Sequence, residues 1–251
     1  PGEQPLDPSV IKLNTNENPY PPSSLVQEIV QSASAEELRF YPDPVCRELR
    51  KAIGELHGCE GEQVFVGNGS DEILALCLRA FVERTGKVAY FDPSYSLYPV
   101  LCDIEELEKL EIPLADDFSW SIDKSPEASL FFLTTPNAPT GFQYPRKTVE
   151  SFCQSFSGVV VLDEAYVDFA QEHALTWSLK YENVIVVRTL SKSYSLAGIR
   201  LGYAVGPAGL IDALMKIKDS YNVNRLTQNI ARAAIRDQAS MKDNIGRVVM
   251  T

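Results

Sequence analysis

The 251-residue chain has few histidines and no long apolar run. Its two histidines, His57 and His173, lie in polar stretches where we expect them to be solvated, so a serine-hydrolase triad has no support. No apolar run approaches the ~20 residues that span a bilayer. No signal-peptide pattern stands at the start, although Pro1 is not a natural initiator. The sequence therefore predicts neither a membrane protein nor a histidine-based hydrolase.

Cysteines and basic residues are also scarce. The five cysteines are scattered and odd in number, which favours reduced thiols in the cytoplasm over a disulfide framework or a zinc site. A net charge of −11 argues against nucleic-acid binding, and it requires an anionic substrate to meet local positive charge. We expect no metal site, since no clustered His or Cys accompanies the acids. The cysteines are Cys46, Cys59, Cys77, Cys102 and Cys153.

Strand and helix patterns alternate along most of the chain. The apolar fraction of 45% is ample for a core. Mostly continuous apolar runs, typical of strands covered on both faces, occupy residues 64–66, 88–91, 130–133, 159–162, 184–187 and 201–205. Helical patterns lie near residues 44–56, 71–83, 146–156 and 210–220. This order predicts a doubly wound α/β fold with a mostly parallel sheet between helices.

Polar residues follow three of the predicted strands directly. Asn137 lies in a rigid Pro- and Gly-containing turn after residues 130–133, and Asp163 ends the run 159–162. Lys192 follows the run 184–187. In open α/β sheets, ligands bind beyond the carboxyl ends of the strands. We therefore expect these three side chains at one site.

Lys192 has the surroundings of a cofactor-binding lysine. Its amine can form a Schiff base with an aldehyde, and the hydroxyls before it, with Arg200 eight residues on, could hold a phosphate. Asp163 could keep a pyridine nitrogen protonated. Together these are the parts that bind pyridoxal phosphate (PLP) covalently. Taken alone, Lys192 would be a surface lysine in a polar loop, and Asp163 a helix N-cap or a metal ligand.

A second anion site is predicted where the strand at 64–66 leads into a helix. The connecting residues 67–72 offer exposed amides and the positive end of the helix dipole. A dinucleotide fingerprint would need glycine at position 72, where Glu72 stands. No phosphate loop ending in Gly-Lys-Ser/Thr occurs either. The sequence thus favours phosphate binding without a nucleotide.

The chain resembles the fold-type-I PLP-dependent aminotransferases, class II-like, and among them the histidinol-phosphate aminotransferase family. The matching segments occur in the family's order and span nearly the whole chain. They are residues 12–20, 41–42, 69–71, 93–95, 136–141, 163–166 and 189–200. One departure is Ala138, where many relatives carry a second asparagine beside Asn137.

The resemblance implies a role for each matched residue. The catalytic set would be Lys192, which forms the Schiff base and moves the substrate proton, with Asp163 on the ring nitrogen and Tyr166. Asn137 and Tyr166 would hydrogen-bond the ring's phenolate oxygen, and Tyr95 would stack on the ring. The remaining cofactor-binding residues would hold the phosphate: Gly69, Ser70, Asp71, Thr189, Ser191, Arg200 and, from a neighbouring subunit, Tyr41. Ordinary packing is the alternative for Tyr41 and Tyr95.

The resemblance also implies a reaction and a domain plan. The reaction would be amino-group exchange between histidinol phosphate and 2-oxoglutarate in histidine biosynthesis, by a cytoplasmic homodimer. Aromatic amino-acid transamination and threonine-phosphate decarboxylation stay open as alternatives. Residues 1–24 would be an arm, in which the segment 14–19 could close over the substrate. Residues 25–238 would be the PLP-binding large domain.

The last residues, 239–251, would begin a small domain that is largely missing from this chain. A single helix over residues 227–251 would lead into it. In the family, the small domain carries the arginine that binds the substrate carboxylate. A truncated PLP-binding fragment without activity is therefore the non-enzyme alternative.

Overall fold

The apolar runs of the sequence form one seven-stranded sheet in the order β1-β7-β6-β5-β4-β2-β3. The computed structural model of the protein describes residues 2–7 and 9–251. Only β7 runs antiparallel to its neighbours, and all the other strand pairs are parallel. The strands are β1 (Val64–Gly67), β2 (Lys87–Asp92), β3 (Glu108–Pro113), β4 (Leu130–Thr134), β5 (Val159–Asp163), β6 (Val184–Thr189) and β7 (Gly202–Val205).

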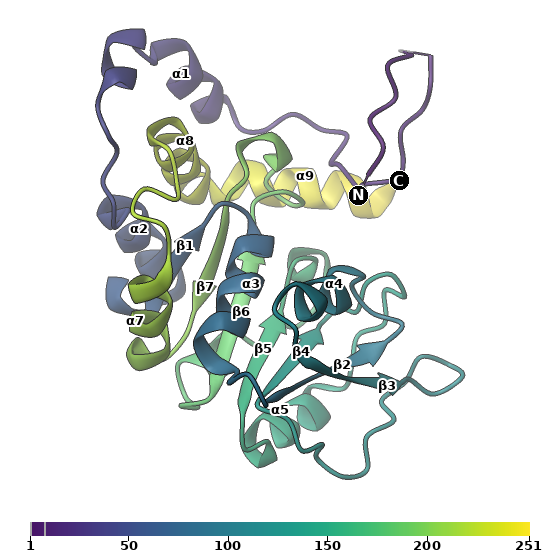
Figure 1. Ribbon diagram of the computed structural model, residues 1–251. Helices are drawn as coiled ribbons and strands as arrows, with labels where there is room; N and C mark the ends of the chain where they lie inside the picture. The colour runs from purple at the N-terminus through teal and green to yellow at the C-terminus, as the bar shows by residue number, and fades with distance from the viewer. Residues whose placement is uncertain (1, 8) are drawn as a thin grey trace.

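Helices cover both faces of this sheet (Figure 1). They are α1 (Ser24–Ser32), α2 (Arg47–His57), α3 (Ser70–Phe81), α4 (Leu97–Ile104), α5 (Arg146–Ser155), α6 (Leu175–Ser178), α7 (Ala208–Ile217), α8 (Arg225–Arg236) and α9 (Gln238–Met250). Short 3₁₀ turns stand at η1 (Ala35–Arg39), η2 (Gly61–Gln63), η3 (Val167–Phe169) and η4 (Ala197–Ile199).

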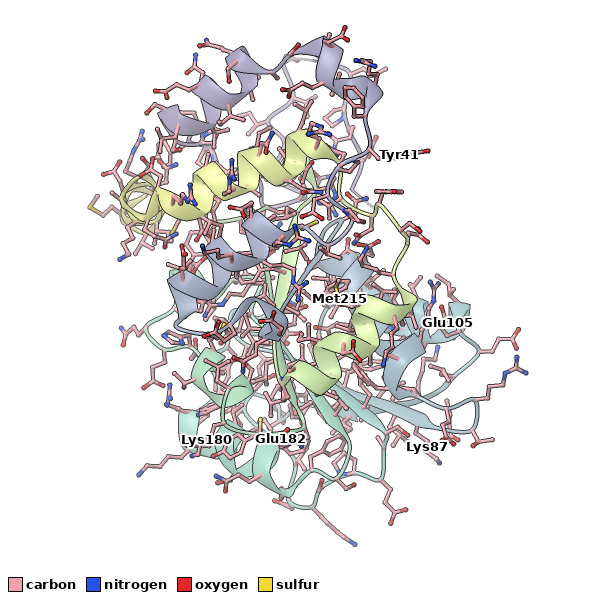
Figure 2. All side chains as sticks on the ribbon, turned by 90° about the vertical axis from the view of Figure 1, so that its left-hand side faces the viewer. Tyr41, Lys87, Glu105, Lys180, Glu182 and Met215 are labelled. Atoms are coloured by element: carbon pink, nitrogen blue, oxygen red, sulfur yellow. The ribbon has the colours of Figure 1, made fainter. Side chains whose placement is uncertain are left out.

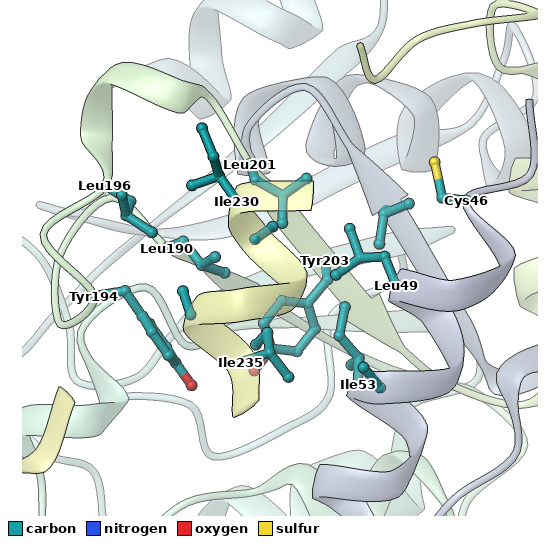
Figure 3. Close-up of a cluster of buried hydrophobic side chains, with 14 of the residues drawn as sticks. Cys46, Leu49, Ile53, Leu190, Tyr194, Leu196, Leu201, Tyr203, Ile230 and Ile235 are labelled. Atoms are coloured by element: carbon teal, nitrogen blue, oxygen red, sulfur yellow. The ribbon is translucent and has the colours of Figure 1, made fainter. Parts of the chain in front are cut away.

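Alternate residues of the central strands enter different cores. Val161 of β5 packs with α3, α4 and α7, whereas Val160 and Leu162 pack with α5 and α6. A third cluster joins α2 and α8 to β1 and β7 (Figure 3). This two-sided burial explains the continuous apolar runs and confirms the predicted α/β class with a mostly parallel sheet.

Some elements lacked a clear sequence signal. Strand β3 lies at the sheet edge and carries Glu108, Lys109 and Glu111, so its pattern is not apolar. Helix α4 was not predicted because Pro99, in its first turn, interrupts the helical pattern of the sequence. The single helix expected over residues 227–251 is wrong, because α8 and α9 separate at Asp237, whose carboxylate caps α9 by accepting from the Ser240 amide. The domain boundaries at residues 24 and 238 stay predictions.

The expectation that both histidines are solvated is wrong for His57. Its Nε2 lies 2.9 Å from the Tyr203 hydroxyl, and its burial at the end of α2 lowers its pKa from 6.5 to about 3. His173 is exposed. A neutral, hydrogen-bonded His57 is a packing residue of α2 against β7.

Replacing Gly202 with alanine should destabilise the fold, because a Cβ there would lie 2.4 Å from the Ser70 amide nitrogen and 2.6 Å from the Gly69 carbonyl carbon. Both obstacles are backbone, so we expect a loss of ~1–3 kcal/mol in the free energy of unfolding, measured in urea. Gly209→Ala in the first turn of α7 is the control: outside its chain neighbours and its own helix backbone, no atom lies within 4 Å of the new methyl group, so the free energy of unfolding should not fall. A tolerated Gly202→Ala would contradict this packing.

Candidate active site

A cavity of about 1080 Å³ opens at the carboxyl ends of β4, β5 and β6. The last residue of each strand lines it, namely Thr134, Asp163 and Thr189. Parallel strands end at the same sheet edge, which is why three separate runs deliver polar groups to one place. Nine of the twelve predicted site residues line this cavity: Ser70, Asp71, Tyr95, Asp163, Tyr166, Thr189, Ser191, Lys192 and Arg200.

Asp163 is a buried carboxyl with two hydrogen-bond donors. The Tyr98 hydroxyl donates to its Oδ2 at 2.9 Å, and the Ala165 amide donates to its Oδ1 at 3.1 Å. Burial raises the pKa of Asp163 from 3.8 to about 6, and the two hydrogen bonds oppose that rise. A negative charge on Asp163 is thus costly until a cation lies against it, as a protonated ring nitrogen would.

The N-terminal arm closes over Lys192. The Lys192 ammonium donates to the Thr15 carbonyl at 2.7 Å, and the Asn18 amide donates to the Lys192 carbonyl at 3.1 Å. Asn16 donates to the Tyr166 hydroxyl at 3.0 Å, and the Tyr166 ring centroid lies 5.4 Å from the Lys192 nitrogen. The segment 14–19 therefore lies beside the lysine, where the sequence placed a closing arm.

An anion-binding corner forms where α3 begins. The turn at Gly69 has φ +91°, and a Cβ there would lie 2.6 Å from the Arg200 Nη2. This close approach brings the guanidinium against the amide end of a 12-residue helix that starts at Ser70. The hydroxyls of Thr189 and Ser191 lie 3.0 Å apart in the same cavity. Arg200 Nη2 also lies 3.5 Å from the half-exposed carboxylate of Asp71. A cation, helix-start amides and hydroxyls are the donor set that a phosphate requires, so the residues present fit PLP.

Asn137 does not line the cavity, and Ala138 does. Asn137 is 2% exposed, and its amide group donates to the Pro93 carbonyl at 3.0 Å and to the Thr140 hydroxyl at 2.9 Å. One hydrogen of this amide is therefore used within its own loop and the other by the loop after β2, and none is directed at the cavity. The residue that could face a ring oxygen from this loop is an alanine. The departure from the family pattern at position 138 thus falls at the cavity wall.

Tyr41 and Gly69 also lie outside the lining. Tyr41 is 76% exposed and stacks on Tyr221 with ring centroids 4.4 Å apart (Figure 2). It projects from the loop after η1 and is not among the residues that line this cavity. Gly69 is buried behind the cavity wall at the N-cap of α3.

A buried ion pair, missed from the sequence, lies behind the catalytic candidates. Arg188 Nη2 lies 2.7 Å from Glu164 Oε2, and their side chains are 11% and 1% exposed. Glu164 directly follows Asp163, and the Ser193 hydroxyl, next to Lys192, donates to Asp168, which lies 4.0 Å from Arg188. The pair thus ties the loop after β5 to strand β6, and the Ser193–Asp168 hydrogen bond links this loop to the one after β6. Two opposite charges at the ends of adjacent apolar runs were the available signal.

Among residues 2–7 and 9–251, no group of three or more His, Cys, Asp or Glu side chains gathers as a metal site would require. In the same part of the chain, none of the helices has both the length and the apolar character needed to cross a membrane.

The pKa of Asp163 gives a pH-dependent stability. Because the folded pKa of about 6 exceeds the unfolded value of 3.8, the protonated carboxyl stabilises the fold fully below the unfolded pKa, and this contribution is lost as pH rises through 6. Two pKa units correspond to ~3 kcal/mol. In cofactor-free protein, Asp163→Asn should gain up to that much stability over the wild type between about pH 3 and pH 8. Urea unfolding at both pH values measures it, and a pH-independent difference would contradict the assignment.

Comparisons with known proteins agree with this geometry. The family model for aminotransferase class I and II matches residues 8–249. Histidinol-phosphate aminotransferases of Geotalea uraniireducens and Geotalea daltonii are 46% and 44% identical over the whole chain, which spans 73% of their length.

Among solved structures, histidinol-phosphate aminotransferase from Sinorhizobium meliloti in complex with pyridoxal-5'-phosphate superposes with a TM-score of 0.86 at 27% identity. The match covers 94% of this chain and 66% of that one. The resemblance drawn from seven short segments is thereby confirmed. The chain belongs to the aminotransferase class I and II family.

Proposed function

We propose that the protein is a PLP-dependent aminotransferase that exchanges the amino group of histidinol phosphate with 2-oxoglutarate, a step of histidine biosynthesis. The observation that carries the proposal is the single cavity in which Asp163, Lys192 and the Arg200 corner meet. Relatives named for this activity, 46% identical over the whole chain, support the choice of substrate.

Each side chain has a distinct task in holding the cofactor. Arg200, Ser70, Thr189 and Ser191 would bind its phosphate, and Lys192 would hold it covalently through Nζ. Bound PLP supplies an electron sink for the carbon that loses a proton. Asp163 would hold a proton on the ring nitrogen, and Tyr95 would pack on the ring.

Lys192 would also move the substrate proton. Its nitrogen lies beside the Tyr166 ring, with the arm's Thr15 carbonyl as its acceptor. A lysine within reach of the reacting carbon can take the proton as a base and return it as an acid. The Asn16 contact orients the Tyr166 hydroxyl, the group that would face the ring oxygen where Ala138 offers no donor.

The homodimer is part of the proposal. Tyr41 is exposed, next to Phe40 at 53% exposed and stacked on Tyr221, and these rings would be covered by a second subunit. There Tyr41 would reach the partner's phosphate corner. We also place the protein in the cytoplasm, which its five free cysteines support, four of them buried.

Lys192→Ala should abolish covalent cofactor binding, because no other lysine among the described residues lines the cavity. The wild type incubated with PLP and reduced with borohydride should gain one cofactor by intact mass. The variant should gain none and lose its aldimine-band absorbance. Lys216→Ala, an exposed lysine paired with Asp212 on α7, is the control and should keep the adduct. An adduct retained at full yield in Lys192→Ala would overturn the assignment.

Histidinol phosphate should be preferred over phenylalanine, tyrosine and aspartate as amino donor. A substrate phosphate makes charge-assisted hydrogen bonds worth ~1.5–3 kcal/mol each, so kcat/KM should differ by at least ~10-fold. Steady-state kinetics of the 251-residue protein with 2-oxoglutarate as acceptor measures this. Equal kcat/KM values for phenylalanine would favour an aromatic aminotransferase, and release of carbon dioxide from threonine phosphate would favour a decarboxylase. If the protein binds PLP but turns over no donor, it is an inactive fragment.

A further inference from the structure

A chain of four hydrogen bonds runs from the Asn137 loop to the Asp163 carboxyl. Ser94 Oγ lies 3.0 Å from Asn137 Oδ1 and 3.1 Å from Thr134 Oγ1. Thr134 Oγ1 lies 2.5 Å from the Tyr98 hydroxyl, which lies 2.9 Å from Asp163 Oδ2. Tyr98, Thr134, Asn137 and Asp163 are all at most 3% exposed, and Ser94 is half-buried.

The direction of the first bond is fixed by the Pro93 carbonyl. A carbonyl only accepts, so the Asn137 NH₂ group must face Pro93. Its second hydrogen goes to the Thr140 hydroxyl, which also accepts from the Phe142 amide. The Asn137 oxygen must therefore face Ser94, and Ser94 must give its only hydroxyl hydrogen to it.

Counting hydrogens shows which state of Asp163 completes the chain. Three hydroxyls supply three hydrogens for four contacts. With Asp163 protonated, a fourth hydrogen is present: Asp163 donates to Tyr98, Tyr98 to Thr134, Thr134 to Ser94, and Ser94 to Asn137. With Asp163 ionised, Tyr98 donates to the carboxylate, and this bond by itself lowers the pKa of Asp163. Thr134 must then donate to Tyr98, so the contact between Thr134 and Ser94 has no hydrogen, and this loss favours the protonated carboxyl.

We propose that Asn137 and Ser94 are positioning residues that act through Thr134 and Tyr98 to hold a proton on Asp163. This rests on the proposed function only in making Asp163 the partner of the ring nitrogen. It gives Asn137 a task that its place outside the cavity otherwise leaves unexplained. A neutral Asp163 avoids an unpaired buried charge until a cationic ring nitrogen lies against it.

The charged groups near Asp163 take no part in this series of hydrogen bonds. Asp71 on α3 and the adjacent Glu164 favour the protonated carboxyl through their negative charge. Lys192 and Arg200 line the same cavity and favour the carboxylate. Substitutions within the hydroxyl chain change none of these charges, so their effect on Asp163 reports on hydrogen bonding alone.

The test is the pKa of Asp163 in full-length, cofactor-free protein, measured by carbon-13 NMR of labelled aspartate carboxyls. The signal with a midpoint of about 6 is assigned by its loss in Asp163→Asn. Ser94→Ala removes the contact that lacks a hydrogen in the ionised state. It should therefore lower the midpoint by about 0.5 to 1 unit, the value of one neutral hydrogen bond.

The Tyr98 hydroxyl must carry this effect. In a Tyr98→Phe background, whose ring keeps its stacking on Phe132, Ser94→Ala should leave the midpoint unchanged. Tyr144→Phe is the control, because the buried Tyr144 hydroxyl has no partner among the described residues. Equal Ser94→Ala shifts in both backgrounds, or no shift in either, would overturn the proposal. Because no cofactor is used, this outcome is separate from failure of the Lys192 adduct.

Discussion

The structure depends on one costly feature, a carboxyl buried at the end of a central strand. Asp163 is 3% exposed in a position where unpaired ionisation is unfavourable. The Ala165 amide and the Tyr98 hydroxyl reduce that cost by donating to the carboxyl, whereas the hydroxyls behind Tyr98 favour its protonated form. A surface carboxyl would need none of these. The residues at the carboxyl ends of the central strands thus surround Asp163, whose carboxylate form is stable only when a cation lies against it.

The pairing of strands in the sheet brings the loop that carries Lys192 close to this carboxyl. Strands β5 and β6 are parallel neighbours, with Asp163 paired to Val187, so the loop after β6 begins beside Asp163. The buried Arg188–Glu164 pair ties the loop after β5 to β6, the Ser193–Asp168 hydrogen bond joins the two loops, and Lys192 donates to the Thr15 carbonyl of the arm. A buried ion pair is weak evidence for stability, but removing one partner would leave a lone charge beneath the site. Its position argues for alignment of the two loops.

The features that could be predicted from the sequence are those that depend on residues close together along the chain. Continuous apolar runs predicted six of the strands, and polar residues after them predicted the cavity edge where Asp163 and Lys192 meet. Contacts between distant segments left no such signal. Tyr98 reads as one apolar residue of a helix disguised by Pro99, yet folding places its hydroxyl on Asp163. Asn137 and Ala138 are adjacent in sequence, and only the loop geometry decides which of them faces the cavity. His57 was expected to be solvated because its hydrogen-bond partner, Tyr203 on β7, lies 146 residues away in the sequence.

A crystal structure of the protein grown with PLP tests the central claim most directly, because that claim concerns geometry. The account predicts continuous density from Lys192 Nζ to the cofactor, an Asp163 oxygen at ~2.7–2.9 Å from the ring nitrogen, and the phosphate between Arg200 and the Ser70 amide. Cofactor bound elsewhere, or a ring nitrogen that faces away from Asp163, would contradict it.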